Sequence, residues 1–298
     1  MITKFGKRFI ASYLAGMVSF PKQDIAIGVA DGTDYAASDS NTRLGFEFYR
    51  LPASFGSIDI QTDGGGNSTY SVIYKATLPQ DIAGIVKEIA LYPGSRTSVN
   101  SFDSKFISDF ENNLVWFDSA NQNPASVAFS EEDPIYPVPR IGSSLIMIEV
   151  PQGTSEQYSA TISPFDISGY SANDSLSLVY EKDDTNLSSI KVKLYSSDTA
   201  YHMATFTASG SAGQKIANIN LSALTTHNGP TSTITKVAIE VTAGSGGDSV
   251  VYLDGLRIND EDTFDPTFGM IARDVLVTPL EKKAGKPVDI EYKIGLTF

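Results

Sequence analysis

The side chains that could perform chemistry are few in kind. The 298 residues include 35 Asp and Glu, two histidines (His202 and His227) and no cysteine. The lack of Cys excludes disulfides, thiolate metal sites and a Cys nucleophile. A Ser-His-Asp triad needs only one His, but the sequence contains no GxSxG nucleophile elbow. We therefore expect both histidines, His202 in a strand and His227 in a loop, to be structural or exposed.

Carboxylates in pairs can hydrolyse glycosides, so the acidic clusters need an interpretation. Glu131–Asp133, Asp183–Asp184 and DEDTFD (260–265) read as solvated loops. DEDTFD lacks the Gly at position 6 and the Glu at position 12 of a calcium-binding loop. GGGN (64–67) lacks the Lys-Ser/Thr of a phosphate loop and predicts a hairpin turn.

Aromatic side chains could instead stack on sugar rings. Trp116 is the single Trp, and five tyrosines follow it in the middle of the chain. Because an aromatic residue in a β-sandwich is more often part of the core, we nominate none of them as a glycan contact. The set is Trp116, Tyr136, Tyr158, Tyr170, Tyr195 and Tyr201.

The elements that must position these residues differ along the chain. Residues 101–259 contain 8 Lys and Arg against 18 Asp and Glu, a net charge of −10, whereas the flanks contribute only −3 of the total of −13. Such an acidic surface repels phosphate backbones, so we expect no nucleic-acid partner. The uneven charge also indicates a modular chain.

The N-terminal residues predict an amphipathic helix. Phe5, Phe9, Tyr13 and Met17 recur at i, i+4 spacing, with Thr3 as a candidate N-cap. Lys7 and Arg8 interrupt the apolar run, which is unlike a signal peptide. No segment reaches the roughly 20 apolar residues that span a bilayer, so we expect no membrane insertion.

The middle of the chain predicts an antiparallel sandwich. Short β-branched and aromatic runs recur between turn residues, for example SLIMIEV (144–150), SIKVKLYS (189–196) and SVVYLDGLRI (249–258). The final run, PVDIEYKIGLTF, alternates throughout and must lay its apolar face on something. The N-terminal strands (72–78 and 85–92) lack enough partners for a core, so we expect the tail to join them.

The fold class we predict is therefore mainly β. A small β-rich domain with an N-terminal helix, formed by 1–100 plus 260–298, is interrupted by an inserted jelly-roll sandwich at 101–259. Insertion at a surface hairpin is well tolerated because the ends of a domain often lie close together.

The flanks resemble a small β-rich domain of tailed-bacteriophage structural proteins, notably fibre and baseplate-peripheral proteins. The matching segments are IAIG (25–28), LGFEFYRLP (44–52), VKEIALYPG (86–94), MIAR (270–273) and VDIEYKIGLTF (288–298). Each segment is a weak match alone, and the resemblance depends on their order along the chain. This sequence departs from the pattern by placing the insert in what is usually a short loop.

The insert resembles the jelly-roll of carbohydrate-binding modules in ISDFEN (107–112), GSSLIMIEV (142–150) and VYLDGLRI (251–258). That resemblance implies one structural calcium ion, with Asp109 or Glu111 and Asp254 as ligands. Calcium takes carboxylate and carbonyl oxygens, so the chemistry suits the residues. Without a metal, an Arg partner or an edge position beside Gly255 would explain Asp254 in its strand.

Together the resemblances imply a non-enzymatic component of a tailed-phage virion, in the tail, a fibre or the baseplate periphery. It would be assembled in the host cytoplasm. Its expected partners are other virion proteins, further copies of itself and host surface glycans, and the helix with the RLP segment is the expected docking side. The alternatives are a carbohydrate-active accessory protein or glycoside hydrolase, and a purely architectural decoration that binds no sugar.

Overall fold

The computed structural model consists of β-sheets with one α-helix, as the sequence predicted. It describes residues 1–15, 23–66, 68–93, 105–111, 114–128, 137–172, 174–183, 185–208, 212–259 and 269–297. Met17, Tyr136, Asp184 and the acidic segments 131–133 and 260–265 lie outside these residues. The chain divides into two compact units, Met1–Val99 with Asp262–Phe298 (unit 1) and Asn100–Glu261 (unit 2).

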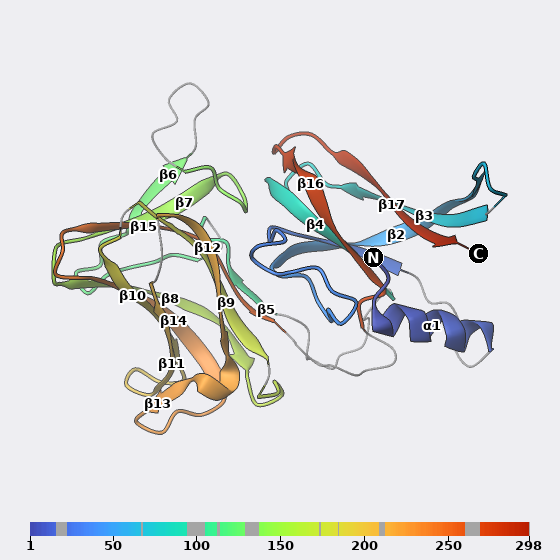
Figure 1. Ribbon diagram of the computed structural model, residues 1–298. Helices are drawn as coiled ribbons and strands as arrows, with labels where there is room; N and C mark the ends of the chain where they lie inside the picture. The colour runs from blue at the N-terminus through green and yellow to red at the C-terminus, as the bar shows by residue number, and fades with distance from the viewer. Residues whose placement is uncertain are drawn as a thin grey trace. The chain divides into compact units, whose positions relative to one another are not determined.

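Unit 1 is a six-stranded antiparallel sheet with strand order β16-β4-β1-β2-β3-β17. The final strand lies on β3, with Tyr292 opposite Tyr74, so the last residues of the chain complete a sheet begun by the first hundred (Figure 1). The strands are β1 (Gln23–Gly28), β2 (Glu47–Thr62), β3 (Ser68–Leu78), β4 (Gly84–Pro93), β16 (Ala272–Lys282) and β17 (Val288–Thr297).

Helix α1 (Lys4–Leu14) covers part of this sheet's apolar face. The hydroxyl of Thr3 accepts a hydrogen bond from the amide of Gly6 at 3.0 Å, the N-cap contact that the sequence predicted. The same hydroxyl donates to the carbonyl of Ile271 at 3.1 Å and so ties the helix start to the chain just before β16. Phe9 is buried in the core, whereas Tyr13 stays exposed.

Strand β2 changes partner along its length. Its first half pairs with β1 and its second half with β3, with a register shift between Phe55 and Ser57. The β2–β3 hairpin closes through the glycine-rich turn, where Gly66 takes a φ of 85°, a conformation that favours glycine. The turn predicted at GGGN is therefore present in its described part.

Unit 2 is a sandwich of two antiparallel sheets around one apolar core. One sheet has five strands in the order β13-β11-β10-β14-β8; the other has the order β12-β9-β15-β7-β6, with β5 also paired to β15. The strands are β5 (Lys105–Ser108), β6 (Ala125–Ala128), β7 (Ser144–Val150), β8 (Ser155–Asp166), β9 (Ser175–Lys182), β10 (Leu187–Tyr195), β11 (Tyr201–Thr207), β12 (Gly213–Asn220), β13 (Thr225–His227), β14 (Thr233–Ala243) and β15 (Ser249–Asn259).

The alternation of the strands separates the core from the outer faces. Ile190, Val192 and Leu194 of β10 point into the core, so Lys191, Lys193 and Tyr195 point outward. A single 3₁₀ turn, η1 (Leu221–Ala223), is the helical element among the described residues of unit 2. Among the described residues, no helix is both long and apolar enough to cross a bilayer.

Candidate functional site

A row of side chains crosses the outer face of the five-stranded sheet of unit 2, one from each strand. The register places Thr161 opposite Lys236, Lys236 opposite Tyr195, Tyr195 opposite Tyr201, and Tyr201 opposite His227. Directly opposed residues of an antiparallel sheet project from the same face. We call these five residues the aromatic row.

The three rings of the aromatic row, those of Tyr195, Tyr201 and His227, are in contact one after the other. The centroids of Tyr195 and Tyr201 lie 4.9 Å apart, and those of Tyr201 and His227 lie 4.8 Å apart with the planes inclined by only 24°. The Nζ of Lys236 sits 4.5 Å from the centre of the Tyr195 ring, within cation–π range. Tyr195 is nearly buried, whereas Tyr201 is half-buried and His227 exposed, so the accessible part of the row is Tyr201 and His227.

The structure corrects one detail at this site. His227 was expected in a loop, but Thr225–His227 forms β13, because residues 225–227 pair with β11. This short edge strand carries His227 onto the stack with Tyr201. His202 lies in β11 as expected, and its Nε2 is 3.1 Å from the carbonyl oxygen of Thr231.

Hydrogen-bonding groups lie beside the rings. The Nζ of Lys193 donates to Glu240 Oε2 and to Gln157 Oε1, both at 2.6 Å, and Lys191 donates to Glu240 Oε1 at 2.6 Å. Partial burial raises the pKa of Glu240, but the hydrogen bonds from the two lysines outweigh it and leave this pKa below its ordinary value. A general acid needs a raised pKa, so Glu240 suits binding rather than proton donation.

A pocket of about 480 Å³ extends the row beyond β8. Thr161 and Lys236 line it together with Phe117, whose backbone pairs with Ser159 at the edge of the sheet. The side chain of Phe117 is 39% exposed and that of Val115 is 59% exposed. The face therefore offers flat apolar surface at both ends and charged, hydrogen-bonding groups between them.

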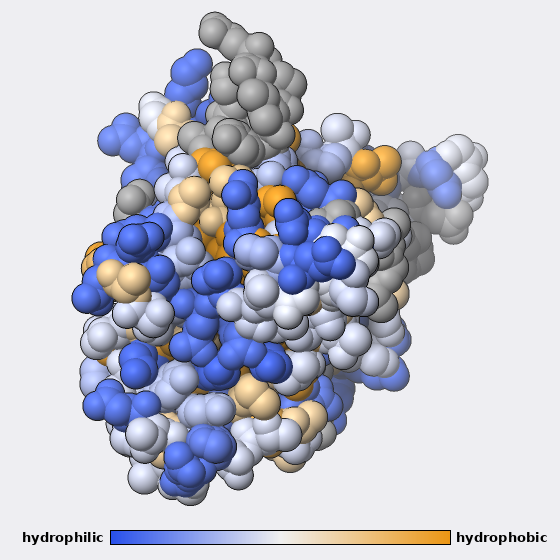
Figure 2. All heavy atoms as spheres, turned by 90° about the vertical axis from the view of Figure 1, so that its left-hand side faces the viewer, coloured by the Kyte–Doolittle hydropathy of each residue, from blue (hydrophilic) through white to orange (hydrophobic). Residues whose placement is uncertain are grey.

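The remaining aromatic candidates lie elsewhere. Trp116 is buried against Phe110, with ring centroids 5.2 Å apart. Tyr158 and Tyr170 are partly buried and pack against the core. The side of unit 2 seen in Figure 2 is mostly hydrophilic, with apolar side chains in small scattered areas.

Asp254, the residue singled out for calcium, is the extra residue of a β-bulge. Leu253 and Gly255 pair with the consecutive residues Tyr180 and Val179, so Asp254 is left over and its side chain is re-aimed. The residue is 2% exposed and lies in an inner strand, which rules out the edge position considered from the sequence.

The partners of Asp254 are backbone amides. Its Oδ2 accepts from Arg140 N at 2.7 Å and its Oδ1 from Ile141 N at 3.2 Å. Burial nevertheless raises the pKa of Asp254 to about 8, although the two amides and the Arg140 charge lower it. Burial therefore favours the protonated form of this carboxyl.

The other two predicted ligands behave differently. Glu111 accepts from the amides of Ser143 and Ser144, so it holds the same 140–144 segment as Asp254, and its charge adds to the rise in the Asp254 pKa. Asp109 caps the turn at Glu111, accepting from its amide at 3.0 Å. Within the described ranges, no three His, Asp or Glu side chains form a group that could hold a metal ion. A calcium ion here would have Glu111 and Asp254 as side-chain ligands and would need other oxygens to complete its shell.

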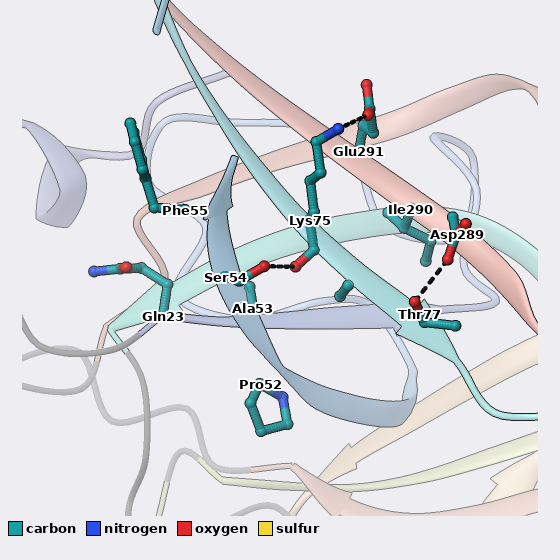
Figure 3. Close-up of a pocket in the computed structure, with 11 residues that line it drawn as sticks. Gln23, Pro52, Ala53, Ser54, Phe55, Lys75, Thr77, Asp289, Ile290 and Glu291 are labelled. Atoms are coloured by element: carbon teal, nitrogen blue, oxygen red, sulfur yellow. Dashed lines mark hydrogen bonds and ion pairs between the residues drawn. The ribbon is translucent and has the colours of Figure 1, made fainter. Parts of the chain in front are cut away.

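Unit 1 carries a groove of about 800 Å³ where β2 bends over β3 and β17. Along one wall, Lys75 pairs with Glu291 at 2.5 Å and Thr77 donates to Asp289 at 2.6 Å (Figure 3). Pro52 of the RLP segment and the exposed ring of Phe55 come from β2. Every charged group on this wall has an opposite or hydrogen-bonding partner among the residues described.

Comparisons with known proteins give no family. No protein-family model matches the chain, and no curated protein matches it in sequence. Among solved structures, the chain is similar to a carbohydrate-binding module, CBM28, specific for non-crystalline cellulose (13% identity, TM-score 0.36, covering 51% of this chain and 93% of that one). It is also similar to an exo-β-agarase (14%, 0.34, 52% and 25%) and to the enzymatically active domain of bacteriophage CBA120 tailspike protein 4 (10%, 0.30, 54% and 21%).

The match thus spans about a quarter of the agarase and about a fifth of the tailspike chain. At these identities and TM-scores, the similarities assign neither a ligand nor an activity to this chain.

Proposed function

We propose that the protein is a non-enzymatic structural component of a tailed-phage virion, assembled in the host cytoplasm, whose unit 2 binds host surface glycans. The observation that carries the glycan part is the aromatic row. Tyr201 and His227 form a flat, accessible stack, and Lys193, Lys236 and Glu240 lie within the same face. Sugar rings combine a flat apolar side with a rim of hydroxyls, which is the chemistry that stacked rings flanked by charged groups recognise.

The attachment part rests on unit 1. The five sequence segments that resemble the phage domain all fall within this unit, and four of them contribute to neighbouring strands of one sheet, β1, β2, β4 and β16, with the fifth in β17. In this proposal unit 1 binds other virion proteins and further copies of the chain. Many weak glycan sites on one particle would then gain avidity of roughly 10²–10⁴ over a single site.

We also propose a structural calcium ion held by Glu111 and Asp254. Two carboxyls converge on one short backbone segment, and one of them is buried with a raised pKa, which is the state expected of a ligand without its cation. The ion would fix the 140–144 segment to β15.

A glycoside hydrolase is the competing function, and the neighbouring carboxyls of Glu181 and Asp183 favour it. Glu181 lies on β9 opposite Gln214, and burial together with the nearby Asp183 raises its pKa. A carboxyl with a raised pKa beside a second carboxylate is the arrangement that glycosidases use.

A glycan array combined with a reducing-sugar assay tests the proposal. We expect binding without sugar release. Release that disappears in Glu181→Gln would establish the hydrolase instead, and no binding across a broad glycan set would favour a purely architectural decoration. A particle reconstruction that places this chain on the virion, with unit 1 against its neighbours, tests the attachment role.

A further inference from the structure

The outer edge of β17 is an unused pairing surface. β17 ends the sheet of unit 1 and pairs with β3 alone among the strands described. Its ten residues run from Val288 to Thr297. Within the described residues, no backbone hydrogen bond reaches its other edge. A long strand with free N–H and C=O groups is a template for another strand.

The side chains of β17 decide which strand would fit. Ile290, Tyr292 and Ile294 are buried on the inner face, so Asp289, Glu291 and Lys293 project from the outer face. Proteins usually protect an open edge with like charges, which repel a second copy. Here the signs alternate: Glu291 is negative and Lys293 positive, and both are more than 40% exposed.

The register centred on Tyr292 gives the strand opposite-charge pairs without any like-charge pair. If two copies of β17 pair antiparallel about Tyr292, Glu291 of each copy lies opposite Lys293 of the other. Asp289 then faces Gly295, which carries no charge. A register centred on Lys293 opposes the two lysines, and one centred on Ile290 opposes Asp289 to Glu291. A register centred on Glu291 sets each Asp289 opposite Lys293 but also opposes the two Glu291 side chains. Opposite charges across a strand pair stabilise it and like charges destabilise it.

Charges within each copy continue the same pattern. Glu291 already pairs with Lys75 on β3 (Figure 3), and Lys293 pairs with Asp59 on β2 at 2.6 Å. The second copy would insert its Lys293 on the free side of Glu291. Positive and negative groups then alternate from β3 of one copy to β2 of the other.

The apolar face shared by β2, β3 and β17 also continues across such a pair. Ile58 lies opposite Val72, which lies opposite Ile294. On β2, the part of this apolar face farthest from β17, Ile58 is 60% exposed and Ile60 is 58% exposed. Pairing about Tyr292 sets Ile290 of the second copy beside Ile294 and so enlarges the apolar surface on one side of the joined sheet.

We propose that the partner of β17 is a second copy of this chain, paired antiparallel about a two-fold axis at Tyr292. Both copies use the same surface, as a two-fold interface requires. The inference rests on the attachment role proposed for unit 1 and names its partner. A failure would leave glycan binding by unit 2 untouched.

Charge reversal tests the register in the full chain. We expect sedimentation velocity across a concentration series to show a monomer–dimer equilibrium. Glu291→Lys and Lys293→Glu should each weaken dimerisation by about tenfold, because each turns two opposite pairs into two like pairs. The double variant E291K/K293E restores both pairs between the copies and should dimerise more strongly than either single variant. Within each copy its new charges face Lys75 and Asp59, as those of the single variants do. Asp289→Asn is the matched control and should change nothing, since Asp289 faces Gly295.

Cross-linking tests the same register independently. The chain has no cysteine of its own, so E291C and K293C chains can be mixed under oxidising conditions. Opposed Cα atoms lie about 4.5–5.5 Å apart in an antiparallel pair, within the range of a disulfide. The mixture should form a linked heterodimer faster than either variant links to itself.

Three results would overturn the proposal. They are a chain that stays monomeric throughout the concentration series, a double variant no better than the single ones, and E291C linking to itself as readily as to K293C. Thermal melts of each variant check that unit 1 is folded. If a single variant misfolds, the cross-linking comparison decides.

Discussion

Glu88 and Arg273 form a fully buried ion pair between strands that lie on opposite sides of the insertion in the chain. Arg273 Nη2 is 2.8 Å from Glu88 Oε2, and both side chains are 0% exposed. Glu88 also accepts from the amides of Gly45 and Phe46, and Arg273 donates to the carbonyl of Tyr35 at 2.9 Å. The pair therefore fixes β4, β16 and the 35–46 segment to one another.

Removing one charge of this pair should destabilise unit 1 severely. Glu88→Gln keeps the shape but leaves Arg273 buried and unpaired, and such a change costs about 3–5 kcal/mol. Denaturant unfolding should show the transition of unit 1 moving to lower concentration while that of unit 2 stays in place.

Glu281→Gln provides the matched control, because Glu281 pairs with Lys283 on the surface, where ion pairs contribute about 0–1 kcal/mol. Equal losses in the two variants would show that the buried pair does not hold the unit together. The double variant E88M/R273M should lose less stability than Glu88→Gln, since it leaves no uncompensated charge.

The protonation of Asp254 should make unit 2 less stable as the pH rises. Its pKa is about 8 when folded and near the ordinary 3.8 when unfolded. Between these values the folded state binds the extra proton, so the free energy of unfolding falls from about pH 4 to pH 8 and is level outside that window. Asp254→Asn removes the proton and should flatten this slope, by up to about 1.4 kcal/mol per pH unit. Melts recorded in chelator at several pH values measure it, and identical slopes in both chains would refute the assignment.

Calcium should reverse that dependence. A cation needs the ionised carboxylate, so its binding releases the proton of Asp254 and stabilises unit 2 most where the proton is already lost. We expect EDTA to lower the melting temperature of unit 2 and calcium to restore it, more strongly at pH 8 than at pH 6. Asp254→Asn should abolish the response. A melt that EDTA leaves unchanged in the original chain would remove the calcium proposal.

The sequence predicted those strands whose alternation is regular. Residues 288–298 alternate throughout, and β17 spans Val288–Thr297. The strands β8 and β12 could not be predicted in this way because their patterns are weak: in β8 only Ala160 and Ile162 are buried, and the whole of β12 is at least partly exposed. A strand at or near a sheet edge has little apolar periodicity by which it could be recognised in the sequence.

The site residues show the same limit. The oddity of Asp254 within an apolar strand was visible, but its partners lie 113 and 114 residues away, so nothing local revealed the bulge or the amides. Likewise the Glu88–Arg273 pair spans 185 residues. Tyr201 was one of several equal aromatic candidates, and only the register of β11 with β10 and β13 distinguishes it.

Truncation of Tyr201 should weaken glycan binding strongly without unfolding the protein. Tyr201 is the central ring of the accessible stack, and a central aromatic contact is typically worth 2 kcal/mol or more. Tyr201→Ala should weaken binding at least tenfold in titration calorimetry, whereas Tyr201→Phe should retain most of the affinity. Thr205→Ala is the matched control, because Thr205 is exposed on the same face but lies opposite Lys191, outside the row. Equal losses in Tyr201→Ala and Thr205→Ala would place the glycan elsewhere.

Each unit should fold without the other. In unit 2, β5 near its start pairs with β15 near its end, with Lys105 opposite Ile258. In unit 1, the strands that flank the insertion are also neighbours, with Leu91 opposite Ala272. Because each unit brings its own break points together and has its own apolar core, neither needs the other to close its chain.

Two shortened chains test this independence. Residues 100–261 alone, and unit 1 with a short Gly/Ser turn in place of 95–268, should each unfold cooperatively at the midpoint of the matching transition in the full chain. The Gly/Ser turn is feasible because a hairpin connection needs only a few residues between paired strands. Glu88→Gln provides an internal check, since it should destabilise the shortened unit 1 as much as the full chain. A shortened chain that unfolds without cooperativity would show that the two units depend on each other.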